Sequence, residues 1–182
     1  MKKLLLIGDS IRLSYQPHVT ELLKGSAVVV GPEDNCKFAK YTTWYIKAWF
    51  DELGVPDVIH WNNGIWDAYT QNAEIGVFTT LEDYVRDLAR TLVEMRKVCP
   101  NIVWASTTPV DDRFAFLDNA TVDRYNAAAA GLMNRNGIPI HDLNAVLRDP
   151  RGEFFAEDYL HLSEKGQWAC ARSVVDAVRK VL

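Results

Sequence analysis

The sequence predicts a single α/β domain, in which helices cover both faces of a parallel sheet. Two observations carry this prediction. Short, continuously apolar segments recur along the chain, as expected for strands buried on both faces. Between them lie longer segments whose apolar residues recur every three or four positions, which is the pattern of a helix packed on one side. A length of 182 residues suits one domain, so we expect residues 1–182 to fold as one unit.

Each predicted element rests on its own segment. Five segments have the composition of buried strands: Leu4–Ile7, Ala27–Val30, Val58–Trp61, Ile102–Ser106 and Ile138–Ile140. Five are typical of helices: a short one around Pro17–Leu23, then Tyr41–Leu53, Leu81–Val98, Asn119–Asn136 and Ser163–Val181, with Ser163 as a candidate N-cap. Two stretches that each follow a strand, Gly64–Thr80 and Pro109–Asp118, are expected to be irregular loops. They would lie at the edge of the sheet where α/β proteins build their sites.

Composition excludes several classes of protein. Acidic residues outnumber basic ones 24 to 20, which argues against non-specific binding of nucleic acid or of an anionic membrane. Cys36, Cys99 and Cys170 are odd in number and widely spaced, so they indicate reduced thiols rather than disulfides or a metal site. We expect neither a metal nor an organic cofactor.

The N-terminus resembles a signal peptide only in part. Its apolar run, Leu4–Ile7, is shorter than the ~7–15 residues that export requires. No apolar run approaches the ~18 residues of a membrane span. As the sequence stands we expect a cytoplasmic protein that does not enter membranes, although a leader removed ahead of Met1 would leave this same sequence.

The first chemical motif is Gly8-Asp9-Ser10, directly after the first strand. Glycine permits a sharp turn, and a serine at the strand-to-helix junction is raised above the sheet edge near backbone N–H groups. This geometry suits a nucleophile. The alternative is that Ser10 or Asp9 only caps the following helix.

The second motif is Asp158-x-x-His161, just before the last helix. A carboxylate three residues from an imidazole can turn toward it, set its tautomer and stabilise its protonated form. The alternative is a polar turn with a partly buried histidine. Taken together, Ser10, Asp158 and His161 form the set needed for nucleophilic catalysis.

With these motifs the chain resembles the SGNH (GDSL-like) hydrolase family over most of its length. The resemblance implies a flavodoxin-like three-layer α/β/α fold with strand order 2-1-3-4-5, and cleavage of carboxylic esters. It implies Ser10 as nucleophile, His161 as general base and Asp158 as the carboxylate that orients it.

Two further family blocks, which supply the oxyanion hole, are altered. In the second block, Asn35 fits the spacing but Lys40 occupies the glycine position. The backbone N–H of Lys40 can still donate, while its side chain either enters the mouth of the site or, as we favour, lies in solvent. In the third block, Gly-x-Asn-Asp, matching the glycine places Trp66 where the asparagine belongs.

Another register of the third block makes Asn62 or Asn63 the donor, and we expect Asn63; a plain Asn-Gly turn is the alternative. Arg12 is a further candidate, either for the oxyanion or for an anionic group of the substrate, if it is not simply a surface residue. Trp66 and Tyr69 could form a stacking wall for a sugar ring.

The sequence therefore predicts a serine esterase that cleaves a small acyl ester, with a carbohydrate O-acetyl group as the favoured substrate. The predicted catalytic residues are Ser10, His161 and Asp158, and the predicted oxyanion or substrate-binding residues are Asn63, Lys40, Arg12, Asn62 and Trp66. Two alternatives stay open: acyl transfer to a sugar hydroxyl, and a non-catalytic ligand-binding domain on a hydrolase scaffold. The acyl chain, the alcohol and the oligomeric state are not predicted.

Overall fold

A five-stranded parallel sheet forms the centre of the protein. The structure is a computed structural model that describes residues 1–148 and 151–182. The sheet has the order β2-β1-β3-β6-β7, with the strands Lys2–Ile7 (β1), Ala27–Val30 (β2), Val58–Trp61 (β3), Ile102–Ala105 (β6) and Ile140–His141 (β7). Counted along the chain within this sheet, that order is the predicted 2-1-3-4-5. The labels differ because a separate two-stranded sheet, Thr70–Asn72 (β4) and Gly76–Val77 (β5), lies between β3 and β6.

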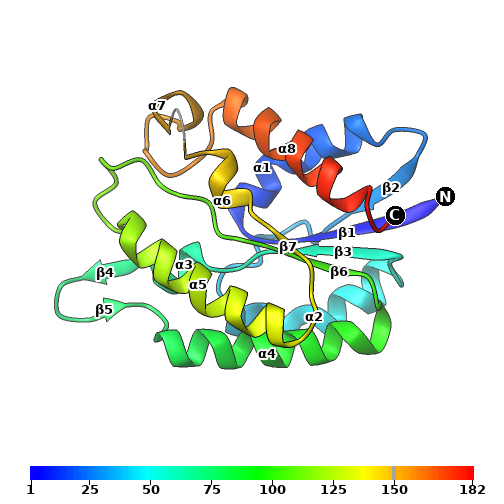
Figure 1. The fold of residues 1–182 in the computed structure, drawn as a ribbon, viewed down its shortest axis with the longest axis horizontal. Coiled ribbons are helices and arrows are strands. Elements are labelled where there is room, and N and C mark those ends of the chain that lie inside the picture. The colour runs from blue at the N-terminus through cyan, green and yellow to red at the C-terminus, as the bar shows by residue number, and fades with distance from the viewer. Residues whose placement is uncertain (149–150) are drawn as a thin grey trace.

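Helices cover both faces of the sheet, which gives the predicted three layers (Figure 1). One face carries α1 (Ser10–Leu22) and α8 (Glu164–Val178), which pack against each other. The other face carries α2 (Ala39–Leu53), α4 (Leu81–Val98) and α5 (Asn119–Arg135). Three one-turn helices complete the described fold: α3 (Ile65–Ala68), α6 (Leu143–Val146) and α7 (Arg151–Phe154).

Most predicted boundaries agree with the structure to within three residues, but the first helix does not. It begins at Ser10, seven residues before the predicted start at Pro17, because the Asp9 carboxylate caps it by accepting a hydrogen bond from the Ile11 N–H at 3.0 Å. Pro17 is tolerated inside the helix because it lies on the exposed side, where water can solvate the carbonyl that a proline cannot pair.

The stretch Gly64–Thr80 is more ordered than predicted. It forms α3 and then the β4–β5 hairpin, which projects from the molecule beyond the ends of the central strands (Figure 1). The hairpin was not predicted because it contains polar, exposed residues such as Gln71 and Asn72, whereas the strands were predicted from buried apolar runs. Pro109–Asp118 contains neither helix nor strand, as predicted.

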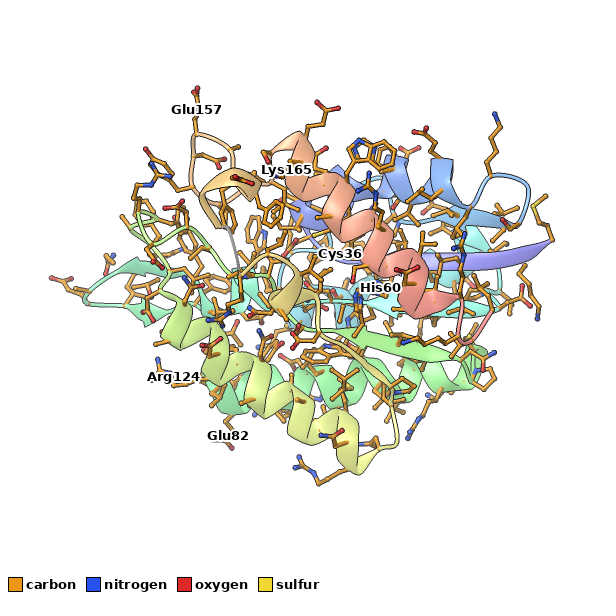
Figure 2. The ribbon with its side chains drawn as sticks, turned by 45° about the horizontal axis from the view of Figure 1, so that its top comes forward. Cys36, His60, Glu82, Arg124, Glu157 and Lys165 are labelled. Carbon is orange, nitrogen blue, oxygen red and sulfur yellow. The ribbon has the colours of Figure 1, made fainter. Side chains whose placement is uncertain are left out.

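The register of the central strands decides which segments meet. Ile7 pairs with Trp61, and Trp61 pairs with Trp104. The chain therefore leaves β1, β3 and β6 at one common edge. The interior beneath that edge is mostly apolar, and His60 Nε2 lies within hydrogen-bond distance of His141 Nδ1, at 3.0 Å, inside it. Figure 2 shows Cys36 and His60 in the middle of the molecule, with Glu82, Arg124 and Glu157 at its periphery.

Candidate active site

Ser10 stands at the junction of β1 and α1, as the first residue of the helix. The turn requires glycine at position 8, since a Cβ there would lie 2.7 Å from the Cβ of Arg12. Asp9, rather than Ser10, caps the helix. The Ser10 hydroxyl is therefore free for another partner, and its N–H is one of the first-turn donors that a helix leaves without an internal acceptor.

The segment from Phe155 to Leu162 is folded back on itself to present His161. A bridge between Phe155 and Leu162 closes it, and Tyr159 at its tip adopts a left-handed conformation with φ of 66°. Inside the turn, Asp158 Oδ1 accepts the backbone N–H groups of Leu160 at 3.1 Å and His161 at 2.9 Å. One carboxylate oxygen thus organises the turn and leaves the other for the imidazole.

Ser10, His161 and Asp158 form a continuous chain of hydrogen bonds. His161 Nε2 lies 3.0 Å from Ser10 Oγ, and His161 Nδ1 lies 2.5 Å from Asp158 Oδ2. Partial burial raises the pKa of Asp158, but hydrogen bonds from His161 and Leu160 outweigh this and hold it below its ordinary value. An ionised carboxylate only accepts, so Nδ1 carries the proton and Nε2 is left to accept the Ser10 hydroxyl.

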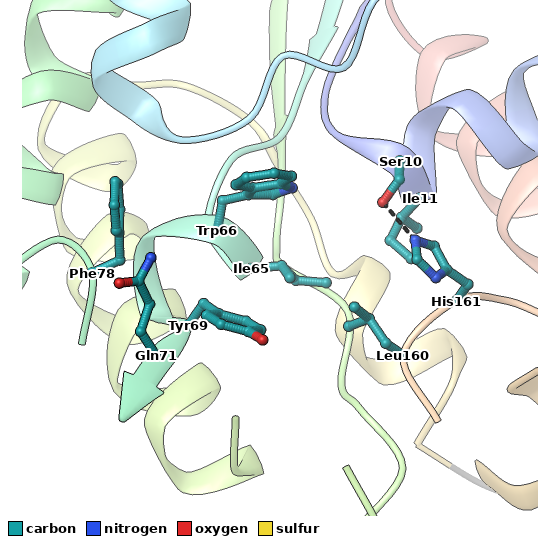
Figure 3. A pocket seen from close by; sticks show the side chains of 9 residues that line it. All are labelled: Ser10, Ile11, Ile65, Trp66, Tyr69, Gln71, Phe78, Leu160 and His161. Carbon is teal, nitrogen blue, oxygen red and sulfur yellow. Dashed lines mark hydrogen bonds between the residues drawn. The ribbon is translucent and has the colours of Figure 1, made fainter. Parts of the chain in front are cut away.

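A cavity of about 360 Å³ opens beside this chain. Besides Ser10 and His161 it is lined by Ile11, Ile65, Trp66, Tyr69, Gln71, Phe78 and Leu160 (Figure 3). The wall is mostly apolar and aromatic, and Phe116 stacks behind Tyr69 with ring centroids 5.5 Å apart. Such a surface accepts a nonpolar group or the face of a sugar ring.

Two of the predicted oxyanion donors do not reach this cavity. The Asn63 amide is fully buried; it donates to the Lys37 carbonyl and to Thr42 Oγ1, both at 3.0 Å, and it accepts from Trp61 Nε1 at 2.8 Å. Asn62 donates to the Ala105 carbonyl at 2.8 Å. The preference for Asn63 was therefore wrong, because its two N–H groups hold the loop before α2 to the end of β3.

Arg12 lies neither in the cavity nor at the protein surface, the two positions predicted for it. Only 1% of it is exposed. Its guanidinium donates to the carbonyls of Pro32 and Asp34, both at 2.9 Å, and to Gln16 Oε1 at 2.9 Å. Arg12 thus ties α1 to the loop that follows β2, and it has no donor directed at a substrate.

Lys40 lies outside the cavity as well. Its side chain is exposed, as we favoured, and borders a separate surface depression between α2 and α4. The first residue of the helix, Ala39, donates its N–H to both carboxylate oxygens of Asp67 at 3.2 and 3.0 Å. The left-handed residue in this loop is Lys37, with φ of 49°, so the position that favours glycine is three residues before the one we matched.

Trp66 is the one residue of the predicted donor set that lines the cavity. Tyr69 lines it too, as expected for a stacking wall. Sequence reasoning missed Ile11, Ile65, Gln71, Phe78 and Leu160. Three of these adjoin predicted site residues, which was an available signal. Gln71 and Phe78 come from the hairpin, and their place could not be read from a stretch interpreted as an irregular loop.

The described residues offer little sign of other kinds of site. Nowhere in 1–148 and 151–182 do three or more metal-binding side chains gather in a way that could hold an ion. None of the helices described there combines the length and apolar character that a bilayer crossing requires.

The fold and this arrangement define a three-layer α/β/α domain with a Ser–His–Asp chain at the carboxyl edge of its sheet. By sequence, no protein family and no curated protein matches the chain. Solved structures do match. They include a lipase/acylhydrolase from Enterococcus faecalis (TM-score 0.82, 19% identity, covering 99% of this chain and 96% of that one). The acetylxylan esterase Axe2 from Geobacillus stearothermophilus matches with TM-score 0.76, 20% identity and coverage of 99% and 94%.

A GDSL-like lipase from Bacteroides thetaiotaomicron matches with TM-score 0.76, 15% identity and coverage of 100% and 89%. These likenesses extend over nearly the whole of each chain. They establish that the protein has the fold of these hydrolases, as the resemblance seen in its motifs implied.

Proposed function

We propose that this protein is a serine esterase of the SGNH (GDSL-like) type, which cleaves a small acyl ester through an acyl-enzyme. The observation that carries the proposal is the hydrogen-bonded chain from Asp158 through His161 to Ser10, at the side of an aromatic cavity. Nucleophile, base and orienting carboxylate lie in the order and at the distances that this chemistry needs.

The proposed reaction has two halves. Ser10 Oγ attacks the ester carbon and gives its proton to His161 Nε2, while the carbonyl electron pair moves onto the oxygen. When the intermediate collapses, the bond to the alcohol breaks and His161 protonates the departing alkoxide. Water then attacks the acyl group in the same way, and the carboxylic acid leaves as Ser10 regains its proton. Asp158 stabilises the imidazolium in both halves.

The cavity supports a sugar ester as substrate. Trp66, Tyr69 and Phe78 offer ring faces for stacking, and the Gln71 amide can both donate to and accept from hydroxyl groups. One structural neighbour, Axe2 from Geobacillus stearothermophilus, is an acetylxylan esterase. We therefore propose an O-acetylated carbohydrate as the substrate class.

The test is hydrolysis of p-nitrophenyl acetate and of an acetylated sugar by wild type and by Ser10→Ala. Loss of the nucleophile is expected to lower kcat by roughly 10⁶-fold, without unfolding the protein. Ser14→Ala on the same helix is the matched control, because the Ser14 hydroxyl donates to the Ile11 carbonyl at 2.7 Å and Ser14 does not line the cavity.

Activity of Ser10→Ala close to that of wild type would contradict the assignment. Binding of sugars by a wild-type protein that releases no acid from any ester would favour the ligand-binding alternative. Appearance of an acylated sugar when a free acceptor is added, at the expense of free acid, would favour acyl transfer.

A further inference from the structure

Most side chains predicted as oxyanion donors are engaged elsewhere in the fold. The Ser10 N–H at the start of α1 is one available donor. The amides of Asn62 and Asn63 and the guanidinium of Arg12 are hydrogen-bonded inside the fold. A further side-chain donor would matter for turnover, because removal of one donor from such a site costs about 10²–10³ in turnover.

Trp66 is placed to supply such a donor. It occupies the second position of α3, lines the same cavity as Ser10 and His161, and is 40% exposed. Figure 3 shows the nitrogen edge of its indole ring turned toward Ser10. The indole N–H makes no hydrogen bond to residues 1–148 or 151–182, whereas the buried Trp61 donates its own to Asn63.

We propose that Trp66 Nε1–H donates to the substrate oxyanion and is a catalytic residue. The inference rests on the proposed function. It assigns to an indole the part that the family's third block gives to an asparagine amide. Indole nitrogen is a donor only, so unlike an amide it presents no oxygen that could repel the developing negative charge.

The short helix that carries Trp66 is anchored at both sides, as a catalytic donor requires. Before it, Gly64 packs so tightly that a Cβ there would lie 2.0 Å from Thr107 Oγ1. Within the helix, directly after Trp66, the buried Asp67 carboxylate accepts the Ala39 N–H at the start of α2, and the Asp67 backbone carbonyl accepts the Thr79 N–H at 2.9 Å. These contacts fix the backbone on which the indole is mounted.

The experiment separates donation from stacking. Trp66→Phe keeps an aromatic ring in the wall but removes the N–H. For p-nitrophenyl acetate, loss of an oxyanion donor is expected to lower kcat by about 10²–10³-fold with KM little changed. Trp44→Phe is the matched control: Trp44 is 81% exposed on α2 and borders the other depression, so its loss is expected to leave both constants unchanged.

A second measurement uses the wild-type protein. A boronic acid that adds to Ser10 forms a tetrahedral adduct, and the indole N–H proton resonance that Trp66→Phe removes is expected to shift on its formation. An unchanged kcat in folded Trp66→Phe, a rise in KM alone, or a resonance that does not move on adduct formation would overturn the inference.

These outcomes are distinct from failure of the proposed function. If the wild type hydrolyses no ester, the esterase proposal fails and the inference fails with it. If the wild type is active and Trp66→Phe is equally active, only the role of Trp66 is lost.

Discussion

The two halves of the candidate site differ in how they are built. In the half that holds the proposed nucleophile, the side chains of Ser10, His161 and Asp158 bond one another. In the half where oxyanion donors were expected, most of the predicted side chains bond the protein itself and lie outside the cavity: Asn63 and Arg12 hold loops in place. The first half is a set of reactive groups, and the second is mainly a scaffold.

The comparison teaches that a polar residue beside an active site need not serve it. Asn63 and Arg12 are close in sequence to site residues, yet their donors are used within the fold, where burying them unpaired would cost roughly 1–3 kcal/mol each. Trp66 is the exception, since it lines the cavity and its indole N–H has no hydrogen-bond partner in the part of the chain that the structure describes. What distinguishes Trp66 from Asn63 and Arg12 is therefore that its N–H donor is available, not the type of residue.

The largest expected effect tests the reactive half. Asp158→Asn keeps the shape of the turn but offers an amide to His161 Nδ1. The imidazole is then free to adopt the tautomer that cannot accept the Ser10 proton, and kcat is expected to fall about 10⁴-fold. Steady-state hydrolysis of p-nitrophenyl acetate measures this effect.

Glu157→Gln is the control, because it removes an adjacent exposed carboxylate with the same change of charge. It is expected to retain full activity. A fall of less than tenfold in Asp158→Asn would remove Asp158 from the catalytic set and break the contrast between the two halves.

The fold and the reactive half were predictable from the sequence because each depends on local pattern. Apolar runs such as Val58–Trp61 mark buried strands wherever they occur, and the alternation of these runs with amphipathic segments decides the layers. Asp158 and His161 are three residues apart, so a single turn brings them together. The β4–β5 hairpin was missed because its strands are only three and two residues long and none of their residues is fully buried.

The scaffold half was not predictable in the same way, because it depends on contacts between distant segments. Whether Asn63 faces the cavity is decided by Thr42 and the Lys37 carbonyl, which lie 21 and 26 residues away in the chain. The glycine-like backbone falls on Lys37, whereas motif spacing placed it at Lys40. Neither the orientation of Asn63 nor the backbone conformation of Lys37 can be predicted from the composition of the neighbouring sequence.

The next expected effect tests the scaffold half through Arg12. Replacing it with methionine keeps much of the apolar volume but leaves the carbonyls of Pro32 and Asp34 without their donor. The free energy of unfolding is expected to fall by about 3–5 kcal/mol, as when one partner of a buried charged interaction is removed. Urea denaturation followed by fluorescence measures it.

Arg135→Met, at an exposed position on α5, is the control and is expected to change stability by less than about 0.5 kcal/mol. A stable Arg12→Met protein with a large loss of kcat would show the opposite of the predicted pattern. That result would indicate that Arg12 takes part in the reaction rather than in holding the fold together.

The last prediction contrasts two aspartates, one in each half. Asp158 is half exposed and its pKa is lowered, whereas burial raises the pKa of Asp67 from 3.8 to about 7, despite its hydrogen bonds from the Ala39 N–H and the Thr79 side chain. The charges of Asp87 and Asp9 raise it further.

Because the folded-state pKa of Asp67 lies above its unfolded value, folding is most favoured while this carboxyl is protonated, and that advantage is lost as pH rises from about 4 to 7. Asp67→Asn cannot ionise, so its stability relative to wild type is expected to improve across this range by on the order of 3 kcal/mol. Urea titrations of both proteins at several pH values measure the difference, in which the titration of all other groups cancels. Parallel curves would mean that Asp67 stays ionised in the folded protein. The anchor of α3 would then be a charged one, held by hydrogen bonds strong enough to outweigh its burial.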